Sequence, residues 1–264
     1  RDAFSNVVNN AVSADFVSFL YSLERNKKKK KKGISISFSE ELKHDYNMKT
    51  SLLLFYVAEI YYLANVLKER GIGTPAYLTL SGTGSKVLDL IGGQPELEGI
   101  AKIVFNDIIG DDGKVELKRV GNPKEITCKG GLNMKSEDVI DDAEDLCYCF
   151  AGSTKLEGLH HARLRDVDNV VINQGVSFYE TFIEYFFGLN SKYSFEKKFG
   201  INTQRSFPEY KRILLEHAHE DLAAVLDARK AERNDPDAEL EDSIFFFPLA
   251  GGLNRLSYYI SNQQ

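Results

Sequence analysis

Apolar residues recur along much of the chain at the spacing of an α-helix. Between residues 3 and 23 this spacing predicts one or two amphipathic helices. Residues 48–70 are expected to form a long helix, rich in aromatic residues and closed by a Gly-Ile-Gly break. Its apolar run at residues 52–67 is broken by two polar residues and is shorter than a membrane span, so we interpret it as a buried helix. Because this helix is apolar on nearly all sides, other elements must cover it.

An alternation of apolar and polar residues at 34–38 indicates a short, half-buried strand or an extended edge, and two further strands are predicted at residues 76–80 and 115–120. The second strand runs directly into the glycine-rich loop Ser81-Gly82-Thr83-Gly84-Ser85-Lys86, which is followed by a short helical stretch at residues 87–91. Pro95 then opens another helix. Strand, glycine loop and helix follow one another in this order where α/β proteins build ligand pockets.

The second half of the chain is expected to be mainly helical. A long amphipathic helix is predicted at residues 208–233, and a last helix at residues 240–260 should be interrupted near Pro248 and Gly251-Gly252. The aromatic residues at 178–187 and 245–247 are interpreted as core, with a binding groove as the alternative. The fold class is therefore α/β with an excess of helix, divided near residue 133 into an α/β module (1–133) and a mainly helical extension (134–264).

Composition and charge narrow the class of protein. Hydrophobic residues make up 43% of the chain and charged residues 27%, as in ordinary globular proteins. The net charge of −6 includes six consecutive lysines at residues 27–32, and the remainder carries −12. A surface this acidic repels a phosphate backbone, so no nucleic-acid partner is expected. We interpret the lysine run as a solvated loop, with a polyanion or membrane-surface contact as the alternative.

The three cysteines, Cys128, Cys147 and Cys149, are too few and too oddly spaced for a disulfide framework. Reduced thiols indicate a cytoplasmic protein, and no transmembrane segment is expected.

The glycine loop is the strongest chemical signal in the sequence. Gly82 and Gly84 lack a Cβ, so a ribose or phosphate can approach the main chain, and free N–H groups at the following helix favour an anion. The loop is not a Walker loop, because Lys86 follows Ser85 and the four-residue spacer is missing. It is not a dinucleotide fingerprint either, because Val87 replaces the third glycine and no clear βαβ unit is evident. A tight structural turn is the alternative.

The loop resembles the adenosine-contacting motif in the second lobe of the superfamily of actin, the 70-kilodalton heat-shock chaperones and the sugar kinases. There a hydrophobic strand runs into Gly-Gly or Gly-Thr-Gly, then a small polar residue and an Arg or Lys. Downstream, the segment from Asn122-Pro123 to Gly131 is similar to the chaperones' closing segment. Upstream, the helix expected at residues 48–70 precedes the strand, as a long helix does in that superfamily. The resemblance therefore covers residues 48–132.

The resemblance implies that Ser81, Gly82, Thr83, Gly84 and Ser85 lie against an adenosine and its phosphates, with Lys86 beside the purine. It implies ATP or ADP with Mg²⁺ as the cofactor of the full-length protein. These ATPases also need an Asp-Gly phosphate hairpin in each lobe, and the single Asp-Gly pair, at 112–113, follows the glycine loop instead of preceding it. We therefore name no catalytic residue, expect no hydrolysis by this chain alone, and expect its main partner to be an N-terminal lobe preceding Arg1.

Other candidate sites are weaker. His217 and His219 point to different sides of a helix, and neither His160-His161 nor Cys147-Tyr148-Cys149 has the spacing of a zinc site, so no metal ligand is named. The sequence leaves two further alternatives: a non-catalytic scaffold that keeps the fold without nucleotide, and a small-molecule kinase. The helical extension could also bind a protein partner.

Overall fold

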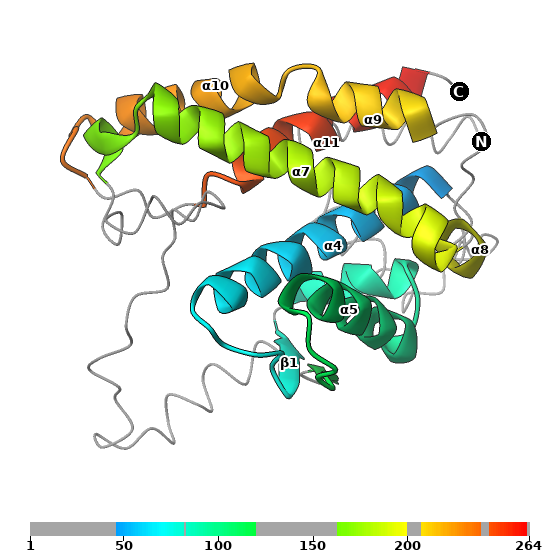
Figure 1. Cartoon of the computed structure of the whole chain (residues 1–264). Coiled ribbons are helices and arrows are strands. Elements are labelled where there is room, and N and C mark those ends of the chain that lie inside the picture. Colours follow the sequence, from blue (N-terminus) through cyan, green and yellow to red (C-terminus); the bar gives the residue numbers. More distant parts are fainter. Residues whose placement is uncertain (1–45, 82, 120–162, 200–206, 239–242, 263–264) are drawn as a thin grey trace, which may run out of the picture.

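The computed structural model describes residues 46–81, 83–119, 163–199, 207–238 and 243–262. They form a helix-rich α/β fold with one small parallel sheet (Figure 1). In chain order the elements are α4 (Tyr46–Glu69), β1 (Tyr77–Leu80), the 3-10 helix η1 (Thr83–Leu90), α5 (Gln94–Ile109), β2 (Glu116–Arg119), the 3-10 helix η4 (Leu164–Asp166), α7 (Asn169–Tyr193), α8 (Phe195–Phe199), α9 (Phe207–Leu215), α10 (Ala218–Arg233) and α11 (Phe246–Asn262).

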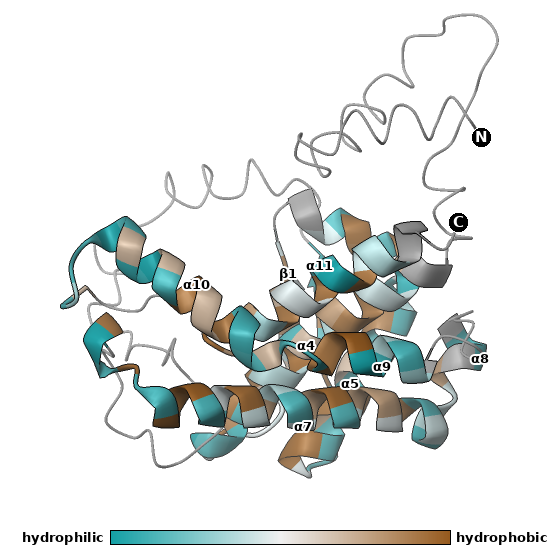
Figure 2. Cartoon of the chain, turned by 90° about the horizontal axis from the view of Figure 1, so that it is seen from above, coloured by the Kyte–Doolittle hydropathy of each residue, from teal (hydrophilic) through white to brown (hydrophobic). Residues whose placement is uncertain are grey.

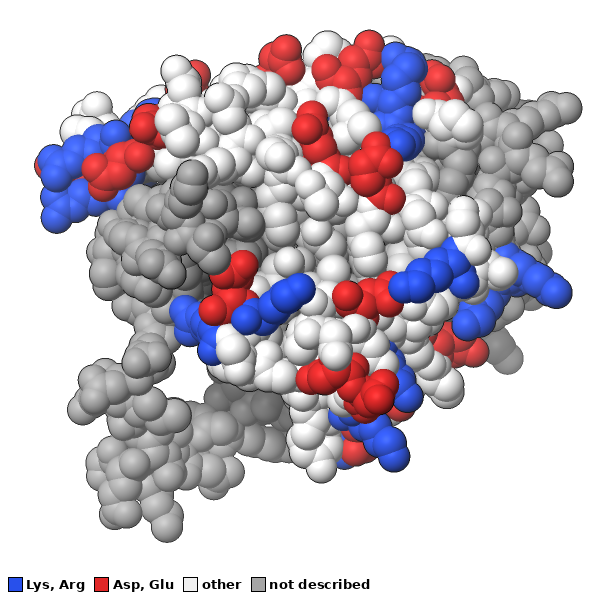
Figure 3. Space-filling model, viewed as in Figure 1, with Lys and Arg blue, Asp and Glu red and all other residues white. Residues whose placement is uncertain are grey.

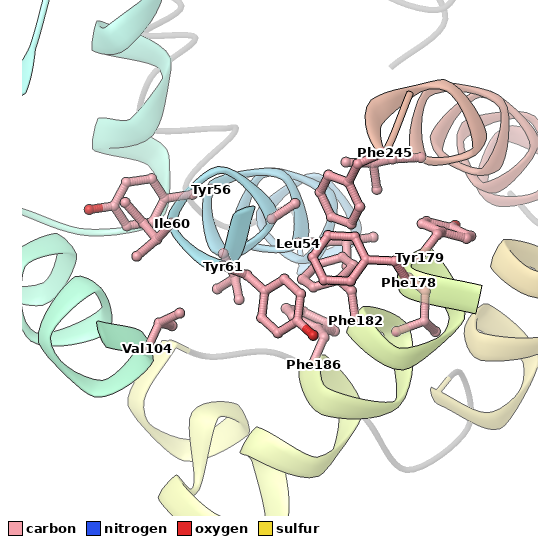
Figure 4. Packing of buried hydrophobic residues seen from close by; sticks show 14 of the residues in the cluster. Leu54, Tyr56, Ile60, Tyr61, Val104, Phe178, Tyr179, Phe182, Phe186 and Phe245 are labelled. Atoms are coloured by element: carbon pink, nitrogen blue, oxygen red, sulfur yellow. The ribbon is translucent and has the colours of Figure 1, made fainter. Parts of the chain in front are cut away.

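Helix α4 lies at the centre of the fold, as the sequence predicts. It packs against α5, η1, α7 and α11, and eight of its apolar side chains between Leu53 and Ala64 are buried. The ring of Tyr61 lies 5.4 Å from that of Phe178 and 5.2 Å from that of Phe182, and the Phe245 ring lies 6.3 Å away. Figure 4 shows these rings converging from α4, from α7 and from the turn that precedes α11. The interpretation of the aromatic segments as core is therefore confirmed for these residues.

The same helix is long and apolar enough to cross a membrane. Among the described residues it alone meets this test of length and composition, over Met48–Glu69, contrary to the expectation from its apolar run. Of its most apolar stretch, 56% is buried inside the fold. A core helix that its neighbours cover passes the same test of length and composition.

The elements β1, η1, α5 and β2 form a βαβ unit. The strands pair in parallel, with Tyr77 opposite Glu116 and Leu80 opposite Arg119. The expectation that residues 76–80 begin no clear βαβ unit is therefore wrong. Helix α5 returns the chain to the end of the sheet at which β1 begins, so that β2 runs parallel to β1. Pro95 lies at the first turn of α5, as predicted, and Gly110 ends that helix in the left-handed conformation with φ of 83°.

The two edges of the sheet differ. The main chain of Leu117 points away from β1, and side chains of α5 satisfy it: its N–H donates to Glu98 Oε2 (3.0 Å) and its C=O accepts from Gln94 Nε2 (2.7 Å). On β1, the groups directed away from β2 belong to Tyr77 and Thr79, and no hydrogen bond joins them to another described residue. Side chains of α5 thus close the β2 side of the sheet, whereas no described residue is hydrogen-bonded to the outer edge of β1.

The C-terminal helices depart from the prediction in two places. Residues 208–233 form two helices, because Tyr179 Oη (3.0 Å) donates to the carbonyl of Leu214 and Arg255 Nε (3.3 Å) to that of Ile213. These side chains satisfy carbonyls at the end of α9 and allow it to stop. Helix α11, by contrast, runs unbroken through Pro248, which lies in its first turn where no intrahelical N–H bond is lost.

The two halves of the chain share one hydrophobic cluster, to which α4, α5, α7, α9, α10 and α11 all contribute. Hydrophobic residues recur along α4 and α7, whereas α10 is largely hydrophilic (Figure 2). Asp107 of α5 also accepts hydrogen bonds from Lys192 Nζ (2.7 Å) and the Tyr193 hydroxyl (2.8 Å) of α7. Residue 133 lies outside the described residues, so the division into two domains stays a prediction.

Gly251 should be intolerant of a side chain. A Cβ there would lie 2.2 Å from Cγ of Asp221, which Arg255 holds in an ion pair of 2.6 Å. We expect Gly251→Ala to lower the free energy of unfolding by about 1–3 kcal/mol in urea denaturation, as for other overpacked sites. Gly188→Ala is the matched control, because a Cβ on this helical glycine meets nothing within 4 Å. It should stabilise the protein by about 1 kcal/mol, and equal effects of the two substitutions would contradict the packing argument.

Candidate functional site

The glycine-rich loop lies at the carboxyl ends of the two parallel strands. Ser81 follows β1 directly and is exposed, and Lys86 is exposed while Ser85 is half-buried. Gly82 lies outside the described residues. Thr83 and Gly84 are the first residues of η1, so the helix begins four residues earlier than predicted. The structure thus keeps the predicted order of strand, glycines and helix, with most of the loop folded into the first turns of η1.

Two leucines fix η1 against the core. Leu88 and Leu90 are buried, and the helix packs against α4. Its first N–H groups precede any residue that could accept them within the helix. The chemistry that this segment offers a ligand is therefore a set of main-chain donors, the hydroxyl of Ser81 and the ammonium group of Lys86.

Arg119 is a site residue that sequence reasoning missed. As the Cα partner of Leu80 it lies beside the start of the loop, and its Nη1 forms an ion pair with Asp89 of η1. Its position as the last residue of β2 was the available signal, because residues at the carboxyl ends of parallel strands meet at one edge of the sheet. This signal identifies Arg119 only once β1 and β2 are known to be parallel neighbours.

The other end of β1 is held by Asp111. Its carboxylate accepts hydrogen bonds from the N–H of Thr74 (2.8 Å), the hydroxyl of Thr74 (2.5 Å) and the N–H of Gly113 (3.2 Å). The hydrogen bonds from Thr74 keep the pKa of Asp111 below its usual range. This contact joins the segment before β1 to the segment before β2, and so supports the parallel pairing on which the loop depends.

The remaining candidates do not form a second chemical site in the part of the chain that the structure describes. His217 and His219 are exposed, and no group of three described His, Cys, Asp or Glu side chains could hold a metal ion. Acidic and basic residues are interspersed on the face shown in Figure 3. The lysine run, the cysteines, His160-His161 and the segment from Asn122 to Gly131 lie outside the described residues.

A shallow hollow of about 410 Å³ lies at the break between α9 and α10, far from the loop in sequence. It is lined mainly by apolar atoms of Ile213, Glu216, His217, Asn254, Arg255, Tyr258 and Tyr259. None of the loop residues lines it.

Comparison with known proteins adds no relative. No family model, no curated protein and no solved structure matches this chain. The argument for function therefore rests on the residues and their geometry.

Acid should release the contact between Asp111 and Thr74. A depressed folded-state pKa gives stability that is present above the unfolded value, near 3.8, and is lost as pH falls through the folded value. We expect Asp111→Asn to lower the urea midpoint at pH 7, and the difference from wild type to shrink below pH 4. Asp112→Asn, at the exposed neighbouring residue, is the control. A difference that stays constant across this pH range would show that the charge of Asp111 is unimportant.

Proposed function

We propose that this chain supplies the adenosine side of a nucleotide-binding cleft, as in the second lobe of actin-like and chaperone-like ATPases. The observation that carries the proposal is the parallel pairing of β1 and β2, since Thr83 and Gly84 follow β1 at the carboxyl edge of the sheet. Open α/β sheets bind ligands in the crevice at this edge.

Each loop residue has a separate role in the proposal. Gly82 and Gly84 let the ribose and phosphates approach the main chain, and the first N–H groups of η1 donate to phosphate oxygens. Lys86, exposed on η1, lies beside the purine. Ser81, Thr83 and Ser85 supply hydroxyl groups that can donate to or accept from the nucleotide.

The chain lacks the groups for hydrolysis in this proposal. Mg²⁺ would bind to the nucleotide's phosphates in the full-length protein, with acidic groups from another lobe. The outer edge of β1 supports such a partner, because no described residue pairs with it and a strand edge without charge or proline readily accepts a further strand. Closure of two lobes around nucleotide would then shift the population of two arrangements. We expect phosphate release from ATP by the 264-residue chain to stay at the background rate.

A scaffold without nucleotide is the second candidate. The observation that favours it is the folding of Thr83–Leu90 into η1, anchored by Leu88 and Leu90, which leaves only the first turn to face a ligand. Nucleotide titration separates the two functions.

Substitution of the loop glycines tests the proposal. A fluorescent adenine nucleotide is titrated against the full-length protein and its Gly82→Val and Gly84→Val variants, and we expect each β-branched side chain to abolish binding by occupying the space beside the main chain. Gly99→Ala, on α5 where a Cβ meets nothing within 4 Å, is the control and should bind as wild type does. A folded wild-type protein that binds no nucleotide would favour the scaffold.

A further inference from the structure

Arg119 contacts the chain on both sides of the glycine-rich loop. Its main chain pairs with Leu80, the residue before the loop, and its side chain reaches Asp89, on the helix after the loop. The segment from residue 81 to residue 88 is thus bridged at both ends by one residue of β2. No other described ion pair joins η1 to the sheet.

The guanidinium group of Arg119 depends on Asp89 for its position. Its Nε and Nη2 atoms are shielded from solvent and have no hydrogen-bond partner among the described residues, whereas Nη1 is paired with Asp89. A guanidinium with two shielded and unpaired nitrogens is poorly stabilised, so its one described acceptor determines where it lies. Removing the carboxylate of Asp89 would free the arginine and, with it, the end of η1.

This pair differs from the neighbouring pair on the same strand. Lys118 and Glu116 are half exposed and lie on the opposite face of the sheet, where the Lys118 ammonium lies 4.8 Å from the centre of the Tyr77 ring. Exposed pairs of that kind contribute little to stability. Arg119 is less exposed, at 28%, and its positive charge partly offsets the rise in pKa that burial causes at Tyr56 of the core helix α4.

We propose that Arg119, acting through Asp89, is a positioning residue that sets the orientation of η1 and thereby of the N–H groups offered to the nucleotide. This inference rests on the proposed function and assigns no direct contact between Arg119 and the ligand. Asp89 lies in the last turn of η1, so the ion pair holds that end of the helix beside the end of β1 and thereby limits the directions in which the main-chain donors of the first turn point.

The test measures nucleotide affinity and fold stability in the same variants. Asp89→Asn and Arg119→Gln should each weaken binding of the fluorescent adenine nucleotide by roughly fivefold to tenfold, and the double variant should be no weaker than either single one. The urea midpoints should change little. Amide hydrogen exchange at residues 83–90 should become faster in both variants, and Arg119→Lys, which keeps the charge, should recover part of the affinity.

Glu116→Gln is the matched control, because it breaks the other ion pair of β2 without touching η1. It should leave both affinity and exchange unchanged. If wild type binds nucleotide and Asp89→Asn or Arg119→Gln binds equally well, or if their losses add in the double variant, the positioning role is wrong while the proposed function stands. If folded wild type binds no nucleotide, the proposed function fails, and the positioning role fails with it.

Discussion

The burial of helix α4 is the constraint from which the rest of the structure follows. A helix whose apolar side chains occupy almost every face is stable in water only when other elements enclose it. Here α5 and η1 cover one side, and α7 and α11 cover the other. The βαβ unit and the C-terminal helices are therefore parts of one core. The aromatic rings around Tyr61 fill the junction where the two groups of helices meet.

Much of this architecture could be predicted from the pattern of apolar residues. Helices over α4 and α5 were expected, the second half was expected to be mainly helical, and both strands of the sheet were expected within a residue or two of their observed bounds. The break between α9 and α10 could not be predicted, since it depends on Tyr179 and Arg255, which come from other helices. Continuity of α11 through Gly251 and Gly252 likewise depends on close neighbours, Asp221 and Tyr179.

The candidate site was likewise predictable only in part from the sequence. Glycines after a strand are a local signal, and the sequence was sufficient to select residues 81–86. Tertiary contacts determine the start of η1 at Thr83 and the position of Arg119. Each depends on which strand lies beside β1 and on which face of the sheet α5 packs. A resemblance based on local motifs could indicate a nucleotide, whereas Arg119, which we propose as a positioning residue, lies 30 positions from its ion-pair partner.

The unequal edges of the sheet have a practical consequence for work with this protein. Gln94 and Glu98 cover the β2 side, whereas no described residue is hydrogen-bonded to the outer edge of β1 at Tyr77 and Thr79. Of the two described strands, β1 is therefore the one onto which another chain can add a strand and cause aggregation. A charged or proline substitution at its rim is the first change to try when expression yields aggregates.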